Sequence, residues 1–364
     1  MLSRLKTKYQ RAHEAYKKYE RLLMPATLGF GFVMDYVTFT HIQVSTALTV
    51  AGTYLVITGL AIAFVQLYDA GRVTHKLKFV HLYAPLLIQF LLGALVGNAF
   101  IFYWFSASFS ASWIFMLIFV GLMVSNELYK EHFKLLLVQL PLYFFVMFSL
   151  FSIALPYIFN SLSSRLFLLA GITSFVICVL FVRLLGRASR EVRVRQKTLT
   201  HAFAAILVAL VSFYFANIIP PVPLALREAG VYHAVARAND GYTLTGEHES
   251  LLQKMLPGQT VHWQRGKRLY VYTAIFAPTD LRTGIYHVWQ EYDETQNAWI
   301  TKDRLSFTIT GGRQQGYRGY SMKSGLEPGK WRVSVETGRG QAMGRLSFLI
   351  EEASEAPVLE SISR

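Results

Sequence analysis

This sequence is short of both charge and cysteine. Only 16% of its 364 residues are charged, whereas 53% are hydrophobic, and the mean hydropathy is +0.34. This composition excludes a disordered chain and an ordinary water-soluble domain. Cys178 is the single cysteine, which excludes a disulfide framework and a zinc site made of cysteines.

Familiar catalytic motifs are also missing. The segment Gly325–Lys330 is one residue short of the phosphate-binding loop spacing and is followed by a tryptophan. The glycines between 338 and 344 do not match the dinucleotide-binding pattern, and there is no nucleophile-elbow or zinc-protease motif. The sequence therefore predicts no catalytic residue, no metal site and no cofactor, and it favours a protein that is not an enzyme.

Long apolar stretches dominate residues 22–219. A helix needs about 20 apolar residues to cross a hydrocarbon core of about 30 Å. Seven such stretches in series predict an α-helical transmembrane bundle with seven spans. They run over residues 22–39, 46–68, 80–104, 108–125, 133–158, 165–182 and 199–219.

Lysine and arginine gather on one side of the predicted bundle. Residues 1–21 carry seven, and the second-to-third, fourth-to-fifth and sixth-to-seventh connections carry three, two and six, whereas the alternate connections carry none, none and one, Arg165. The positive-inside rule then places the N-terminus in the cytoplasm and the chain after about residue 220 outside it. The six basic residues before the last span are predicted to contact anionic lipid: Arg183, Arg187, Arg190, Arg193, Arg195 and Lys197.

The two ends of the membrane region differ in character. Residues 1–21 show an apolar seam on a basic helix, which predicts a cytoplasmic helix lying on the inner leaflet or, alternatively, a short coiled coil between two copies. Residues after 220 carry 17 basic and 15 acidic side chains. The excess positive charge therefore belongs to the membrane region, which argues against nucleic acid as a partner.

The chain after the last span changes from helical to strand periodicity. Three prolines at 220, 221 and 223 end the last helix, and a connector over 220–258 is expected, with a short helix around 247–256. Alternating residues then predict an antiparallel, immunoglobulin-like all-β sandwich over 259–352, followed by a flexible tail, 353–364. The predicted strands are 268–277, 284–292, 304–310, 317–323, 329–337 and 343–351, with another near 231–238.

Short motifs in this domain resemble an uncharacterised bacterial family, domain of unknown function 2914 (DUF2914), over roughly residues 260–352. Leu269–Thr273 is similar to the family's LYCFTRI strand, and His287–Trp289 to its HVW. Ser321–Lys323, followed by Gly329–Val335, resembles its S-K … G-x-WRVDV pattern. Gly31–Asp35 is also similar to the start of membrane-anchored members. The resemblance implies a sandwich outside the cytoplasm and implies no activity.

Polar residues inside the predicted spans are candidate sites. Asp35 lies about 20 Å along the first span, where a carboxylate usually has a partner or a function. The sequence leaves three readings open: a structural bond to Arg165, an aspartate at a water-filled mouth, and a proton or substrate site. Gln89 and Asn98, like Gln139, are explained by interhelical hydrogen bonds or by a polar pathway.

The predicted sandwich offers aromatic and arginine side chains. Tyr270 and Tyr272 face away from Leu269 and Val271, and arginines lie nearby in sequence, so these residues would suit sugar rings or acidic groups. His287 and Trp289 share a strand face and are further candidates. The alternative for each is packing. The complete set of predicted ligand-binding residues is Tyr270, Tyr272, His287, Trp289, Arg313 and Arg318.

Two functions follow from these expectations. The first is a multi-pass protein of the bacterial inner membrane whose external sandwich binds an envelope glycan, lipid or protein without catalysis. The second is a transporter or lipid-handling protein that uses Asp35, with the sandwich as an accessory. In both readings the lipid bilayer is a partner.

Overall fold

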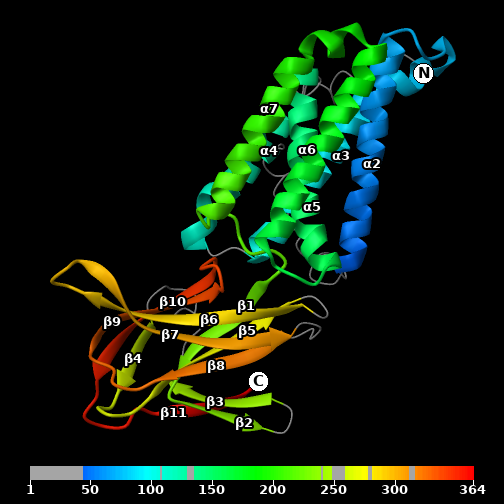
Figure 1. The fold of residues 1–364 in the computed structure, drawn as a ribbon. Coiled ribbons are helices and arrows are strands. Elements are labelled where there is room, and N and C mark those ends of the chain that lie inside the picture. The colour runs from blue at the N-terminus through cyan, green and yellow to red at the C-terminus, as the bar shows by residue number, and fades with distance from the viewer. Residues whose placement is uncertain are drawn as a thin grey trace, which may run out of the picture. The chain divides into compact units, whose positions relative to one another are not determined.

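The computed structural model describes residues 44–106, 109–128, 135–238, 241–247, 259–277, 281–310 and 316–364. Helices come first along the chain and strands follow (Figure 1). The predicted first span, 22–39, and the basic segment 1–21 lie outside the described residues.

Each of the other six predicted spans coincides with a helix. Five of these helices, all but α4, are long and apolar enough to cross a membrane, and α4 contains a shorter apolar segment, Ser112–Ser125. The helices are α2 (Val44–Asp69), α3 (Lys78–Ser106), α4 (Phe109–Leu128), α5 (Leu136–Ile158), α6 (Ser164–Ala188) and α7 (Arg190–Phe215), and a short 3₁₀ turn, η1 (His75–Leu77), precedes α3.

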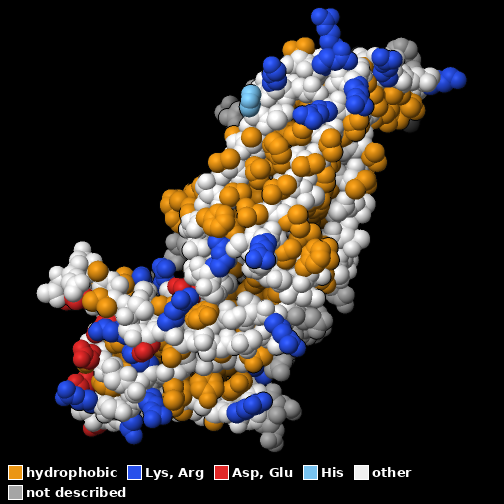
Figure 2. Space-filling view, in the orientation of Figure 1, with side chains coloured by type: hydrophobic (Ala, Val, Ile, Leu, Met, Phe, Trp, Pro, Cys, Tyr) orange, Lys and Arg blue, Asp and Glu red, His pale blue; other side chains and the backbone are white. Residues whose placement is uncertain are grey.

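The helices are apolar on the outside as well as between one another. Phe144 of α5 contacts Phe203 of α7, with ring centroids 5.3 Å apart, and both are fully buried. Large apolar side chains such as Leu60, Phe90 and Leu184 are nevertheless exposed, and Figure 2 shows hydrophobic side chains across the visible helical surface. A helix that is apolar all round is typical of a membrane span.

The strands of the described residues form three sheets. The first has the order β1–β5–β8, the second β4–β10–β9–β6–β7, and the third β11–β3–β2 (Figure 1). The strands are β1 (Ala225–Tyr232), β2 (Ala234–Ala238), β3 (Gly241–Glu247), β4 (Gln259–Trp263), β5 (Leu269–Phe276), β6 (Arg282–Asp293), β7 (Ala298–Thr310), β8 (Tyr317–Lys323), β9 (Gly329–Thr337), β10 (Ala342–Glu352) and β11 (Leu359–Ser363).

The first and second sheets pack face to face as a two-layer sandwich. Leu269 and Val271 of the first sheet share one core cluster with Trp289, Trp331 and Phe348 of the second. These side chains are buried because alternate residues of a strand point to the same face. The third sheet packs on the other face of the first, where its Leu244 forms a cluster with residues of β5.

The strand pattern differs from the predicted antiparallel sandwich in several places. β4 pairs with β10 in parallel, so the sandwich is mixed. The predicted connector, 220–258, contains β1, β2 and β3, and the predicted flexible tail, 353–364, contains β11, which pairs with β3. The short helix predicted around 247–256 lies outside the described residues except for Glu247, which is the last residue of β3.

A bulge explains why β7 begins earlier than predicted. Trp289 of β6 lies opposite Asp303, but the next residue, Gln290, lies opposite Thr301, so Lys302 is an extra residue in β7. An extra residue reverses the inward and outward alternation along the strand. The alternating pattern therefore holds only after the bulge, which is the segment that the sequence predicts.

Candidate functional site

A surface pocket of about 480 Å³ lies in the β domain. Its wall includes the corner between β1 and β2, the turn between β4 and β5, the side chain of Tyr270 and the segment that leads into β11. Two cations, Lys267 and Arg268, come from the turn. Nη1 of Arg268 lies 3.7 Å from the sulfur of Met322, and no carboxylate of the described residues forms an ion pair with Arg268.

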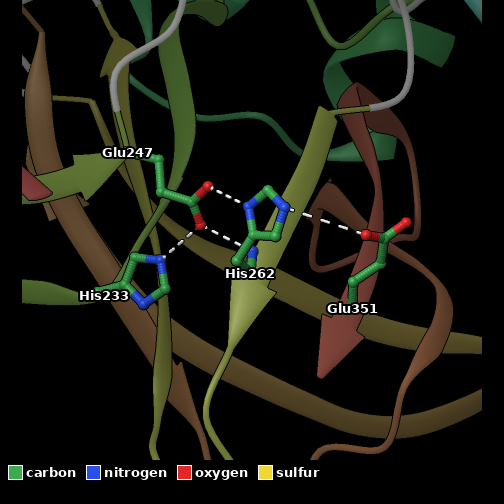
Figure 3. Close-up of polar contacts among 4 residues, drawn as sticks. All are labelled: His233, Glu247, His262 and Glu351. Carbon is green, nitrogen blue, oxygen red and sulfur yellow. Dashed lines mark hydrogen bonds and ion pairs between the residues drawn. The ribbon is translucent and has the colours of Figure 1, made fainter. Parts of the chain in front are cut away.

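A cluster of two histidines around one carboxylate adjoins this pocket (Figure 3). His233, which lines the pocket, donates from Nε2 to Oε1 of Glu247 at 3.0 Å. His262 donates from Nδ1 to Oε2 at 2.7 Å, and its backbone N–H donates to Oε1 at 2.7 Å. We call His233, Glu247 and His262 the histidine clasp.

The strand order brings the clasp together from three separate segments. His233 is the single residue between β1 and β2, Glu247 ends β3, and His262 lies in β4 at the edge of the second sheet. The free N–H groups of an edge strand invite pairing with other chains. Glu247 accepts a hydrogen bond from one of these groups, the backbone N–H of His262, so the clasp links the third sheet to the edge of the second.

Hydrogen bonds set the charges of the clasp. The bond to Glu247 raises the pKa of His262 above its ordinary value. Partial burial alone would raise the pKa of Glu247, but the hydrogen bonds from His262 and His233 together lower it. Near neutral pH the carboxylate is ionised, and a proton on His262 strengthens the clasp.

The clasp provides charge and orientation rather than a nucleophile. The other ring nitrogen of His262 lies 4.0 Å from Glu351, and no hydroxyl or thiol is recorded against it among the described residues. The part of the chain that the structure describes also contains no group of three or more acidic, histidine or cysteine side chains placed to hold a metal ion.

Two of the predicted ligand-binding residues lie in the core instead. His287 and Trp289 are fully buried. Trp289 donates to Ser321 Oγ at 3.0 Å, Ser321 lies 2.8 Å from Nδ1 of His287, and Thr273 lies 3.1 Å from Nε2. This network is inaccessible to a ligand in this structure and matches the packing alternative.

Three other predicted residues share the outer face of the first sheet. Tyr272 lies opposite Tyr320, and Arg318 lies opposite Ala274 on the same side. Tyr272 is fully buried because the third sheet covers it, whereas Tyr270 is half-buried and lines the pocket. Only Tyr270 of the predicted aromatic pair is therefore placed to meet a ligand.

The remaining candidates divide between described and undescribed positions. Arg313 and Asp35 lie outside the described residues, so the predicted Asp35–Arg165 bond is not addressed. Arg165 is exposed, and Gln89 and Asn98 are half-buried in α3.

The six basic residues predicted to contact lipid lie at the end of α6 and the start of α7. Arg193 donates to the carbonyl of Gly186 at 2.7 Å and so caps the end of α6, and Arg195 pairs with Glu191 at 3.2 Å. Lipid contact stays a prediction for this group.

Sequence reasoning missed the clasp and most of the pocket. His233 and Glu247 lie in segments where the sequence predicts one strand and a connector, and the partners are 14 and 15 residues apart. No local pattern links them, because the link depends on the pairing of β3 and on the parallel placement of β4.

Comparison with known proteins supports part of the resemblance. Residues 282–350 match a family described as "Protein of unknown function (DUF2914)". No curated protein matches the chain.

Solved structures add no argument about the fold. A β-glucosidase from Listeria innocua in complex with gluconolactone aligns with 34% of this chain and 16% of its own, at 12% identity and a TM-score of 0.18. An alkylpurine DNA glycosylase from Pseudomonas fluorescens, bound to DNA with an abasic-site analogue, aligns with 84% of this chain and 97% of its own, at 10% identity and a TM-score of 0.23.

Proposed function

We propose that this chain is a multi-pass protein of the bacterial inner membrane that presents its β domain outside the cytoplasm to bind an envelope component without catalysis. Five helices capable of crossing a membrane support the membrane assignment. The uneven distribution of lysine and arginine among the connections supports seven spans with the N-terminus inside. The component is a glycan, a lipid headgroup or a protein segment.

The pocket beside the histidine clasp is the observation that carries the binding proposal. Tyr270 offers a ring for stacking, and Lys267 and Arg268 offer positive charge in the same pocket of about 480 Å³. His233 connects the pocket wall to Glu247 and so fixes its shape. A ring with an acidic substituent fits this combination of side chains.

The test is a thermal unfolding screen of the full-length protein in detergent. Envelope sugars, lipid headgroups and peptidoglycan fragments are added singly, and a ligand that binds the folded protein raises its Tm. We expect the rise to disappear in Tyr270→Ala and Arg268→Ala. Arg237→Ala is the matched control, because Arg237 is an exposed arginine of β2 outside the pocket. An equal rise in wild type and both pocket variants would contradict the assignment of this pocket.

A further inference from the structure

The outer face of the second sheet gathers three arginines from three strands. Arg304 of β7 lies opposite Val288, which lies opposite Ser334, which lies opposite Arg345 of β10. These four residues therefore form one row across the sheet. Arg332 lies two residues before Ser334 on β9, diagonal to Arg345, and diagonal neighbours on one face are within reach of long side chains. We call Arg304, Arg332 and Arg345 the arginine face.

Neutral groups hold two of these guanidiniums in place. Arg332 donates from Nε to Gln290 Oε1 at 2.7 Å and stacks over the ring of Trp299 at 4.3 Å. Arg345 donates from Nε to Ser334 Oγ at 3.2 Å. Both hydrogen bonds are donated by Nε, so neither uses the terminal N–H groups of the guanidinium fork. Partial burial and the nearby charge of Arg345 lower the pKa of Arg332, although the charge of Glu336 opposes this shift.

Among the described residues, the neighbouring lysines form ion pairs with carboxylates, whereas these three arginines do not. Lys302 pairs with Glu291 at 2.8 Å, and Lys330 pairs with Glu294 at 3.3 Å. Arg304 stacks on Tyr286 at 4.2 Å, and no arginine of the arginine face forms an ion pair within 4.0 Å among the described residues. Three positive charges are therefore held by neutral contacts.

One acid lies among them. Glu336 lies opposite Tyr286 on β9. Burial raises the pKa of its carboxyl group although all three arginines oppose this rise. When Glu336 is ionised, its charge and those of the three arginines still add up to an excess of two positive charges.

We propose that the arginine face binds the phosphate monoester of a water-soluble phosphorylated glycan. A phosphate dianion matches the excess charge, and its three terminal oxygens can accept from two guanidinium forks at once. A carboxylate has two oxygens and fits one fork.

A bilayer surface fits this face less well. The exposed large apolar side chains of the described β domain lie on β8, on β11 and just before β11, with none on β6, β7, β9 or β10. A surface that enters a lipid interface usually exposes such side chains. The arginine face also lies on a different sheet from Tyr270, so it is a second site beyond the pocket.

Glucose 6-phosphate is the probe, titrated against full-length protein in a neutral detergent and measured by calorimetry. We expect Arg345→Gln to weaken binding at least tenfold and Arg332→Lys, which keeps the charge but removes the fork, to weaken it severalfold. Glu336→Gln should strengthen binding because it removes the negative charge that lies among the three arginines. Arg282→Gln is the matched control, since Arg282 is an exposed arginine about 20 Å along β6 from Val288.

Thermal unfolding of each variant establishes that it is folded. If an arginine variant fails to fold, Glu336→Gln still tests the proposal, because this variant is expected to bind glucose 6-phosphate more tightly than wild type. The proposal is overturned if wild type does not bind glucose 6-phosphate, if glucose binds as tightly, or if the control weakens binding as much as Arg345→Gln. Binding to phosphatidic acid vesicles without binding to glucose 6-phosphate would also overturn it, in favour of a membrane surface.

Discussion

His287 is held in a network that has no place for a second proton. The hydroxyl of Thr273 has the carbonyl of Gly319 as an acceptor at 3.4 Å, so it can accept from Nε2 of His287. Ser321 accepts from Trp289 and donates to Nδ1 of the same ring. Each polar atom is satisfied by the neutral imidazole, and burial lowers the pKa of His287 to about 4.

Acid should therefore destabilise the β domain through His287. The ordinary pKa is 6.5 and the folded value is about 4, so the unfolded chain binds the proton first. The free energy of unfolding should fall as pH drops from 6.5 to 4, by roughly 3 kcal/mol from this residue. Urea unfolding of the full chain in detergent, read by protease resistance of the β domain, measures it. Other groups titrate in wild type and in His287→Gln alike. The free energy of unfolding of His287→Gln should therefore fall less steeply with falling pH than that of wild type. Parallel curves for the two proteins would rule this mechanism out.

This residue also shows a limit of sequence reasoning. Period-2 alternation correctly indicates that His287 and Trp289 share a face, but it does not say whether that face meets solvent or another sheet. The hydrogen bonds that join His287 to Thr273 of β5 and to Ser321 of β8 show that this face meets the first sheet. The motif residues that resemble the uncharacterised family thus meet in the core.

At the level of the strands, the histidine clasp should hold β3 against the edge strand β4. Glu247→Gln keeps the shape but removes the charge that three donors share. We expect a loss of about 1–2 kcal/mol near pH 6 and faster hydrogen exchange in β4. Glu352→Gln is the control, because Glu352 is an exposed acid of β10 outside the clasp.

The pH dependence of this loss has a defined sign. The lowered pKa of Glu247 means that its stabilisation is lost as pH falls through the folded value, below 4.5. The raised pKa of His262 means that its share is lost as pH rises through the folded value, above 6.5. The difference between wild type and Glu247→Gln should be largest between these limits. A difference that does not change with pH would show that shape, not charge, matters.

Strands with strong alternation could be predicted, and strands that depend on partners could not. The bounds of β8 and β9 agree with the predicted 317–323 and 329–337, because both strands alternate between buried and more exposed residues over most of their length. β11 is exposed along its whole length and β2 nearly so. Such strands bury little of their own surface, and their pairing with β3 forms only once the chain has folded.

For the whole molecule, features that depend on local composition could be predicted from the sequence, whereas features that depend on long-range contacts could not. Six predicted spans coincide with helices because a run of apolar residues is a local property of the chain. The pocket and the arginine face are each assembled from separate segments of the β domain, and those of the pocket lie more than a hundred residues apart. Of the pocket residues, the sequence therefore predicted only Tyr270. Residues brought together by strand pairing are thus harder to predict than helices formed by local runs of apolar residues.

The predicted side of the membrane for the β domain can be tested by cysteine labelling, because the chain has a single cysteine to remove. In a Cys178→Ser background, one new cysteine is introduced as Arg237→Cys or as Lys197→Cys, both at exposed positions. Seven spans with the N-terminus inside put Arg237 outside the cytoplasm and Lys197 within it. A membrane-impermeant maleimide should label Arg237→Cys in intact spheroplasts and label Lys197→Cys only after permeabilisation. The reverse pattern would require an even number of spans before the β domain or an inverted bundle, and it would move the pocket and the arginine face to the cytoplasm, where no envelope glycan could reach them.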